Sequence, residues 1–215
     1  MASNELLNKA HPLKAMLALT IPSMFAQFVN ILYGVVDKLF IANMQSGSGL
    51  ALAGVGICAP ITTLITSFTY LICQGASPLF ATRLGQKDYD DAKKIMANSF
   101  LLLVIITVVL MLVFLIFKKP LLYSFGATPN NFEYASDYIT IYVLGTFFCL
   151  MSLGLNSFIT CQGKSTRAMV TVIIGALTNI LLDYIFIFPF NMGVKGAALA
   201  TIIAQAASAL FAFSF

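Results

Sequence analysis

The sequence has few charged residues. Asp, Glu, Lys and Arg make up 9% of its 215 residues, whereas a soluble globular chain has about 25%. Hydrophobic residues make up 60%, and the mean hydropathy is +0.93. A soluble domain of this size would lack the polar surface to face water, and a disordered chain would need low hydrophobicity. The composition indicates a protein that crosses a membrane several times.

Residues that build metal and disulfide sites are also scarce. His11 is the single histidine, and the four cysteines contain no Cys-x-x-Cys pair. Such pairs are the usual sequence signature of zinc and redox sites. We therefore expect the cysteines to be small apolar core residues (Cys58, Cys73, Cys149 and Cys161).

The uncharged stretches are long and continuously apolar, as from Val104 to Phe117. Barrel strands would alternate apolar and polar residues over about ten positions, so helices are favoured. A spanning helix needs about 20 apolar residues. On this basis the sequence predicts an all-α polytopic membrane protein with six spans, at about 15–42, 50–75, 95–117, 136–160, 167–188 and 196–215.

The basic residues predict the orientation. Six spans place both termini on one side, together with the second-to-third and fourth-to-fifth connections. That side carries most of the basic residues of the connections: Lys9, Lys14, Arg83, Lys87, Lys93, Lys94, Lys164 and Arg167. Basic residues are enriched in cytoplasmic loops. We therefore expect both termini to be cytoplasmic, with residues 1–14 as an N-terminal segment and 15–215 as the membrane lobe.

The stretch from Arg83 to Lys94 is the most charged part of the sequence. It is expected to be a solvated, amphipathic connection between the second and third spans. Asp90 and Lys94 are spaced by four residues, which suits an ion pair on a helix.

Two acidic residues, Asp37 and Asp183, fall inside predicted spans. An ionised carboxylate at mid-membrane costs roughly 2.5–3.5 kcal/mol on insertion scales, and it is usually retained for a function. Alternatives remain: Asp37 could form an interfacial ion pair with Lys38, and Asp183 could be a neutral, hydrogen-bonded core acid.

Polar residues share the helix faces of both acids. Asn30 and Tyr33 lie on one stripe with Asp37, and Asn179 lies one turn before Asp183. A low-dielectric pocket favours the neutral form of a carboxyl group, so these acids could bind and release protons. Such chemistry is typical of a proton-coupled or cation-coupled transporter. Pro22, inside the first span, is expected to kink that helix or act as its hinge.

Six motifs together resemble the amino-terminal half of a multidrug and toxic compound extrusion (MATE) transporter. Their order and spacing extend the resemblance over essentially the whole chain. The motifs are IPSMFAQ…VVDKLFIA (21–42), QGASPLFATRLGQKDYDDAKK (74–94), SDYITIYVLGT (136–146), CQGKSTRAM (161–169), LTNILLDYIFIF (177–188) and MGVKGAALAT (192–201).

The resemblance implies a secondary antiporter of the plasma membrane, neither an enzyme nor dependent on a cofactor. Such proteins export cationic amphipathic drugs and toxic compounds in exchange for Na⁺ or H⁺, through two six-helix lobes around a central cavity. The residues that it implicates fall into three groups. Coupling of the cation or proton is assigned to Asp37, Asp183 and Asn179, with Thr201 as a further Na⁺ ligand; the cavity lining to Asn30, Tyr33, Tyr138 and Thr201; and the hinge to Pro22.

Two departures from the family pattern concern the site. Asn30 replaces a frequent glutamine, and Tyr184 stands where a proline often follows the acid. The shorter amide at Asn30 is expected to change the cavity contacts, and Tyr184 to make the fifth span less prone to bend.

The largest departure is length, because the chain accounts for one lobe. The expected partners are the lipid bilayer, small organic cations and either a missing second lobe or a second copy, but no nucleic acid. Three other functions stay open: a lipid-carrier flippase of related fold, a truncated half that does not transport, and an intramembrane aspartyl protease. The protease lacks its usual Gly-x-Gly-Asp sequence at Asp183.

Overall fold

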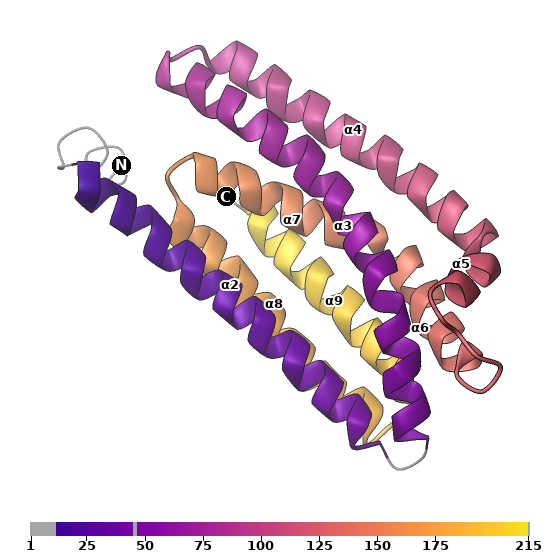
Figure 1. Cartoon of the computed structure of the whole chain (residues 1–215). Helices are drawn as coiled ribbons and strands as arrows, with labels where there is room; N and C mark the ends of the chain where they lie inside the picture. Colours follow the sequence, from indigo (N-terminus) through magenta and orange to yellow (C-terminus); the bar gives the residue numbers. More distant parts are fainter. Residues whose placement is uncertain (1–11, 45–46, 215) are drawn as a thin grey trace.

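A computed structural model describes residues 12–44 and 47–214, and these form an all-helical bundle. Within that part of the chain the backbone builds helices and no strands (Figure 1). The helices are α2 (Pro12–Ala42), α3 (Ser48–Gly85), α4 (Tyr89–Ile116), α5 (Lys118–Ser124), α6 (Phe132–Leu144), α7 (Thr146–Cys161), α8 (Ser165–Ile187) and α9 (Gly193–Phe213). His11 and most of the predicted N-terminal segment 1–14 lie outside the described residues.

Five helices (α2, α3, α4, α8 and α9) are each long and apolar enough to cross a membrane. The fourth predicted span, 136–160, is a bent pair in which α6 and α7 meet at 55°. The prediction of an all-α protein with six spans is therefore confirmed, if the bent pair counts as one. The expectation of one continuous fourth helix is wrong.

The bend between α6 and α7 lies at Gly145, and its cause is on another helix. A Cβ atom at this position would lie 2.2 Å from Cγ1 of Ile202 on α9. Only glycine lets the chain approach α9 this closely, and glycine also weakens the helix locally. Both α6 and α7 consequently pack along α9.

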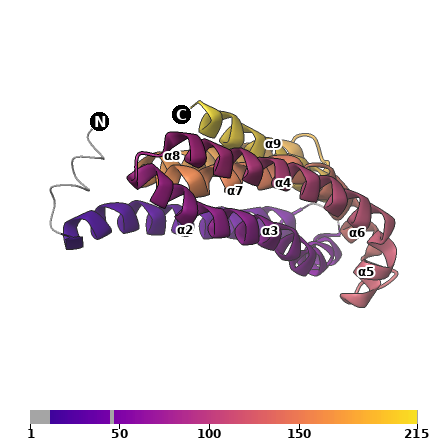
Figure 2. The ribbon, with the colours of Figure 1, turned by 90° about the horizontal axis from the view of Figure 1, so that it is seen from above.

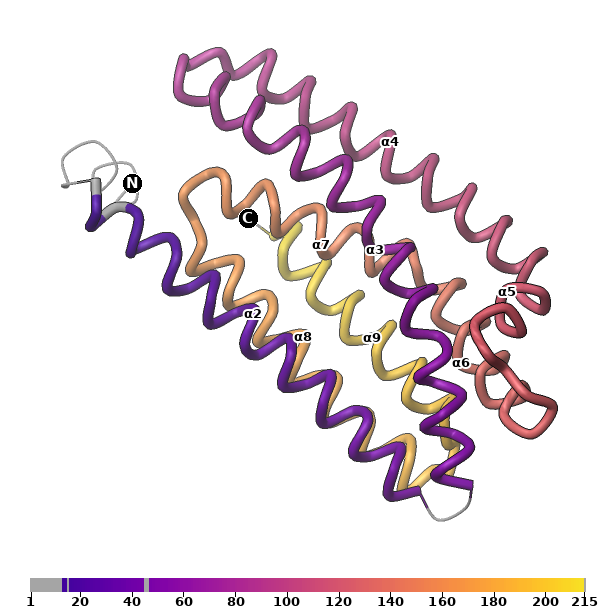
Figure 3. The backbone as a smooth tube through the Cα atoms, viewed as in Figure 1, coloured from indigo at the N-terminus to yellow at the C-terminus, as the bar shows by residue number. Residues whose placement is uncertain are grey.

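The helices form a bundle in which α8 packs most extensively against its neighbours α2 and α9 (Figures 1 and 2). On the far side of α9, α7 contacts α3, and α4 packs outside α3. We call the end of the bundle with the α2–α3 and α8–α9 connections the turn end. The opposite end, where α2 begins and α9 finishes, is the terminal end. The tube in Figure 3 shows α2 and α3 diverging toward the terminal end.

The bundle is apolar outside and partly polar inside. Large side chains such as Phe28 and Ile105 are more than half exposed, as expected for helices that face lipid rather than water. Several buried hydroxyls are satisfied within their own helices: Ser99 donates to the carbonyl of Ile95 and Thr107 to that of Leu103, both at 2.7 Å. Such bonds remove the cost of burying a polar group in an apolar medium.

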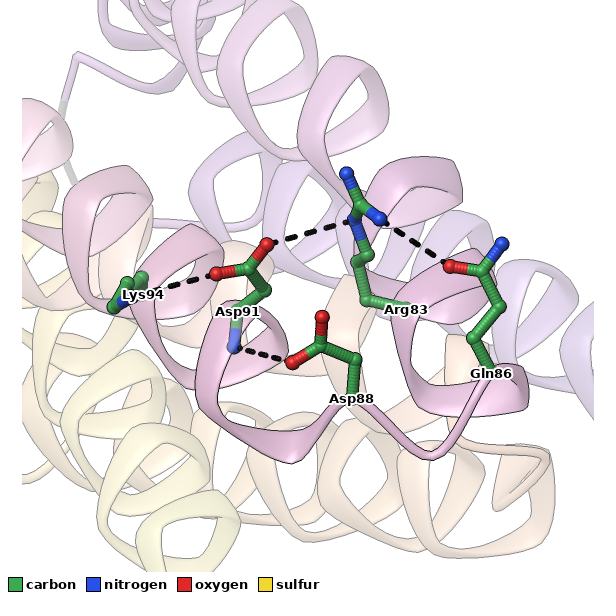
Figure 4. A network of polar contacts seen from close by, with 5 residues as sticks. All are labelled: Arg83, Gln86, Asp88, Asp91 and Lys94. Atoms are coloured by element: carbon green, nitrogen blue, oxygen red, sulfur yellow. Dashed lines mark hydrogen bonds and ion pairs between the residues drawn. The ribbon is translucent and has the colours of Figure 1, made fainter.

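The charged stretch from Arg83 to Lys94 is mostly helical, contrary to the predicted long connection. The connection between α3 and α4 is only residues 86–88, and Asp88 caps α4 by accepting the Asp91 N–H at 3.2 Å. Asp91, rather than the predicted Asp90, pairs with Lys94 at 3.4 Å and with Arg83 at 3.9 Å (Figure 4). Surface pairs of this kind contribute at most about 1 kcal/mol, so they orient the helix ends more than they stabilise the fold.

Two further local features differ from the sequence expectations. The short helix α5 was not predicted, and Lys118 at its start donates from Nζ to Thr140 Oγ1 of α6 at 2.9 Å. Helix α2 is continuous through Pro22. The kink and the hinge role expected at Pro22 both stay predictions.

The contact of α3 with α6 can be tested at Gly54. Its added Cβ would meet Tyr134 Cβ at 2.9 Å and the backbone nitrogen of Ala135 at 3.0 Å. Because backbone cannot move aside cheaply, Gly54→Ala should destabilise the bundle by about 1–3 kcal/mol. The measurement is the thermal midpoint in detergent. Gly56→Ala is the matched control, because its Cβ would meet nothing within 4 Å. Equal midpoints for both variants would contradict the α3–α6 packing.

Candidate functional site

Asp37 of α2 and Asp183 of α8 lie together inside the bundle. Asp37 is 8% exposed and Asp183 is fully buried. Their carboxyl groups are close enough to influence each other electrostatically, because α2 and α8 pack along one another. The structure thus joins the two acids that the sequence singled out separately.

The oxygens of this acid pair have no hydrogen-bond donors among the described residues. This holds for both carboxylate oxygens of Asp183 and for Oδ1 of Asp37. The alternative of an ion pair with Lys38 is not observed: the described residues include no ion pair between the two side chains, and Lys38 is exposed. Buried acceptors without donors are costly, and they can be satisfied by a proton or by a hard cation, which prefers oxygen ligands.

Asn179 adds another free oxygen one turn from Asp183. Its Nδ2 donates to Thr201 Oγ1 of α9 at 3.5 Å, and Thr201 in turn donates to the carbonyl of Ala197 at 3.0 Å. The Asn179 side chain is only 1% exposed, and its Oδ1 has no donor within the described residues. Three helices therefore converge on four predicted residues: Asp37, Asn179, Asp183 and Thr201.

Tyrosines border the acid pair. Tyr138 of α6 is 8% exposed, lies near Asp37 and stacks on Tyr142 with ring centroids 6.2 Å apart. Tyr33, one turn before Asp37 on α2, is near that acid and faces the side chain of Gln205 on α9. The structure brings Tyr33 and Tyr138 to the acid pair, whereas Asn30 lies a further turn away.

The lobe has a groove at its turn end, a small cavity near its centre and a cleft at its terminal end. The turn-end groove, of about 490 Å³, lies near the ion pair of Lys195 with Asp137 (3.3 Å). The central cavity, of about 40 Å³, is lined by polar residues of α2, α7, α8 and α9: Asn30, Tyr33, Ser152, Asn156, Asn179, Thr201, Gln205 and Ser208. The terminal-end cleft, of about 510 Å³, lies between α2, α3, α7 and α8. Asn30 and Asn156 line both the central cavity and this cleft.

The sequence expectations missed the polar residues of α7 and α9 in the central cavity. Ser152 of α7 donates to Ser208 of α9 at 3.1 Å, and Ser208 donates to the carbonyl of Thr171 on α8 at 3.0 Å. A signal for α9 was present, because Thr201, Gln205 and Ser208 are spaced by four and three residues and so share one face. The many small residues around them concealed this pattern.

Comparison with known proteins relates the chain to transporters. The family model MatE matches residues 22–185. The multidrug export protein MepA of Staphylococcus aureus (strain bovine RF122 / ET3-1) is 27% identical over 203 residues, which cover 94% of this chain and 45% of the relative. The chain thus spans about half the length of the curated relatives that it matches.

Two solved structures resemble the whole chain. The crystal structure of MATE in the bent conformation has a TM-score of 0.89 at 29% identity, over 99% of this chain and 46% of that one. An outward-facing multidrug resistance MATE family transporter of the MOP superfamily has a TM-score of 0.88 at 30% identity. It covers 96% of this chain and 45% of that structure.

The contact between the acids can be tested with thiols. In a background with the four native cysteines changed to Ala, Asp37→Cys combined with Asp183→Cys should bind Cd²⁺, because soft thiolates at short distance hold such a metal. The measurement is protection of both thiols from a maleimide reagent. Lys38→Cys combined with Asp183→Cys is the control, since Lys38 is exposed. Protection in the control but not in the Asp37 pair would show that α2 is rotated relative to α8.

Proposed function

The chain belongs to the MatE family, and from this membership we propose that it works as one lobe of a secondary drug exporter driven by Na⁺ or H⁺. The lobe comprises residues 15–215 and crosses the plasma membrane with both termini in the cytoplasm. The terminal-end cleft then faces the cytoplasm, and the turn-end groove faces outward. No cofactor or enzyme chemistry is required, because an ion gradient supplies the free energy.

The observation that carries this proposal is the buried acid pair. Two adjacent carboxyl groups inside an apolar bundle repel each other when both are ionised. A bound proton or Na⁺ removes that repulsion and supplies the missing partner for the buried oxygens. Asp37, Asn179, Asp183 and Thr201 would bind a Na⁺ ion through oxygen, with Tyr138 beside them.

Coupling requires that the cation bind the two conformations of the lobe with different affinity. Because Asp37 and Asp183 are on different helices, neutralising them changes how closely α2 and α8 can approach. Cation binding from the outer side would therefore shift α2, with Pro22 as its hinge, and weaken substrate binding. The substrate would then leave outward.

The terminal-end cleft is the proposed substrate site. Its volume of about 510 Å³ is in the range of about 300–1,000 Å³ that is usual for small-molecule pockets. Its lining combines apolar side chains with the amides of Gln27, Asn30, Gln74 and Asn156. None of the described residues that line it is charged. The charge of an organic cation must therefore be matched elsewhere, by the acid pair or by a second lobe.

The same lining disfavours the flippase alternative. A pyrophosphate headgroup needs several cationic partners, and neither Lys nor Arg is among the described lining residues of the cleft. The protease alternative does require two neighbouring acids, and Asp37 and Asp183 are neighbours. Membership of a transporter family nevertheless supports coupling rather than hydrolysis as the role of this pair.

A second lobe completes the proposed transporter, supplied by another polypeptide or by a second copy of this chain. The mass of the detergent-solubilised protein, measured together with efflux from reconstituted vesicles, distinguishes these possibilities. Efflux by a dimer supports the second copy. A monomer without efflux indicates that the chain needs a separate partner lobe or does not transport.

Substitution of either acid should abolish export. Asp37→Asn and Asp183→Asn each remove a titratable cation ligand while keeping the shape of the side chain. We expect ethidium or norfloxacin efflux from cells that express the complete transporter to fall to the level of cells without it. The control is Asp90→Asn, an exposed acid on α4, which should transport normally at equal expression. Full efflux in both site variants would falsify the coupling role of the pair.

A further inference from the structure

The residues one helical turn from the acid pair along α2 and α8 are polar toward one end of the bundle and apolar toward the other. One turn toward the terminal end, Tyr33 precedes Asp37 and Asn179 precedes Asp183, and both line the central cavity. One turn toward the turn end, Ile41 follows Asp37 and Ile187 follows Asp183. These isoleucines are 0% and 3% exposed and belong to one buried apolar cluster with Val194.

We propose that the central cavity holds water and is the route by which the coupling cation leaves the acid pair toward the terminal-end cleft. Gln205 is the positioning residue of this route. The route rests on the proposed function, whereas the presence of water does not. In this conformation the apolar cluster lies beside the acid pair toward the turn end. Toward the terminal end, Tyr33 and Asn179 lie between the pair and the polar cavity that they line.

The size and lining of the central cavity suit water. A cavity needs about 10–15 Å³ to hold one water molecule, and the water needs two to four polar partners. The central cavity offers about 40 Å³ and polar groups from four helices. Asn179 Oδ1 is a buried acceptor that lines it and has no donor in the described part of the chain. A water molecule would supply that donor.

The cavity and the cleft adjoin each other, because they share lining residues. Asn30 and Asn156 line both hollows, so their amides would pass a water-bound cation or proton from one to the other. Gln205 lines the cavity and faces Tyr33, which itself lies near Asp37. An amide at this point offers both a donor and an acceptor, whereas an apolar residue of similar size would interrupt the polar route.

Radiolytic hydroxyl-radical labelling tests the water directly, because bound water generates radicals in place. The full chain in lipid nanodiscs is irradiated, and the oxidation rates of Tyr33 and Tyr184 are compared by mass spectrometry. Tyr184 is 56% exposed on α8 and lies in the same candidate membrane span as Asp183, and Tyr33 is half-buried. Water in the cavity should make Tyr33 react faster than Tyr184. A slower or equal rate for Tyr33 means a dry cavity and overturns the proposal.

Substitutions at Gln205 test whether this side chain keeps water in the cavity beside Tyr33. Gln205→Leu should lower the Tyr33 rate to that of Tyr184, and Gln205→Ala, which enlarges the cavity, should preserve it. Ile203→Leu, on the outer face of α9, is the control and should change nothing. Unchanged labelling in Gln205→Leu overturns the placement of the water.

The transport measurement separates the route from the proposed function. With the complete transporter, Gln205→Leu should slow efflux, whereas Ile203→Leu, outside the cavity lining, should not. Normal efflux in Gln205→Leu, when Asp183→Asn has none, overturns the route. Normal efflux in Asp183→Asn as well means that the proposed function fails, and the route with it, while the labelling result for the water stands independently.

Discussion

The burial of Asp37 against Asp183 is the constraint on which the rest of the lobe depends. A carboxylate in an apolar bundle is costly, and two in contact cost more because they repel each other when ionised. The neighbouring Lys38 acts on Asp37 alone, and its side chain is exposed and forms no ion pair among the described residues. The packing of α8 against α2 and α9 must therefore hold the pair together, and a proton or cation that binds there lowers the free energy of that packed arrangement.

Unsatisfied polar atoms are not scattered through the bundle. Buried hydroxyls such as those of Ser99 and Thr107 donate to their own helices. The buried side-chain atoms without partners in the described chain are concentrated elsewhere, at Asp37, Asn179 and Asp183, and at Ser77 and Ser165 in the terminal-end cleft, with Thr69 as the exception. Since such atoms cost free energy when left unpaired, their positions mark where the lobe is built to receive something it does not itself contain.

The sequence was informative where charge alone decides the outcome. The spacing of the few charged residues predicted the spans, and the stripes of Asn30, Tyr33 and Asp37 and of Asn179 and Asp183 predicted a polar face on each of the two helices. It was uninformative where the cause lies on another helix. The bend at Gly145 depends on Ile202 of α9, and the central cavity depends on how Gln205 meets Tyr33. The helical ends of α3 and α4 were missed because charged residues can extend a helix beyond the apolar span.

The proposed mechanism needs a cation site and a substrate site. This chain supplies all the residues proposed for the first but only part of the second. The acid pair is built from α2 and α8, with Thr201 of α9 beside it, so cation binding needs no residue from outside the lobe. The substrate cleft lies between α2, α3, α7 and α8, where α2 and α3 diverge, and it offers no charge to an organic cation. Movement of α2 would alter both regions at once, because this helix carries Asp37 and also lines the cleft. In the proposed mechanism the lobe therefore holds the whole cation site, whereas the charge that would select an organic cation has to come from outside the cleft.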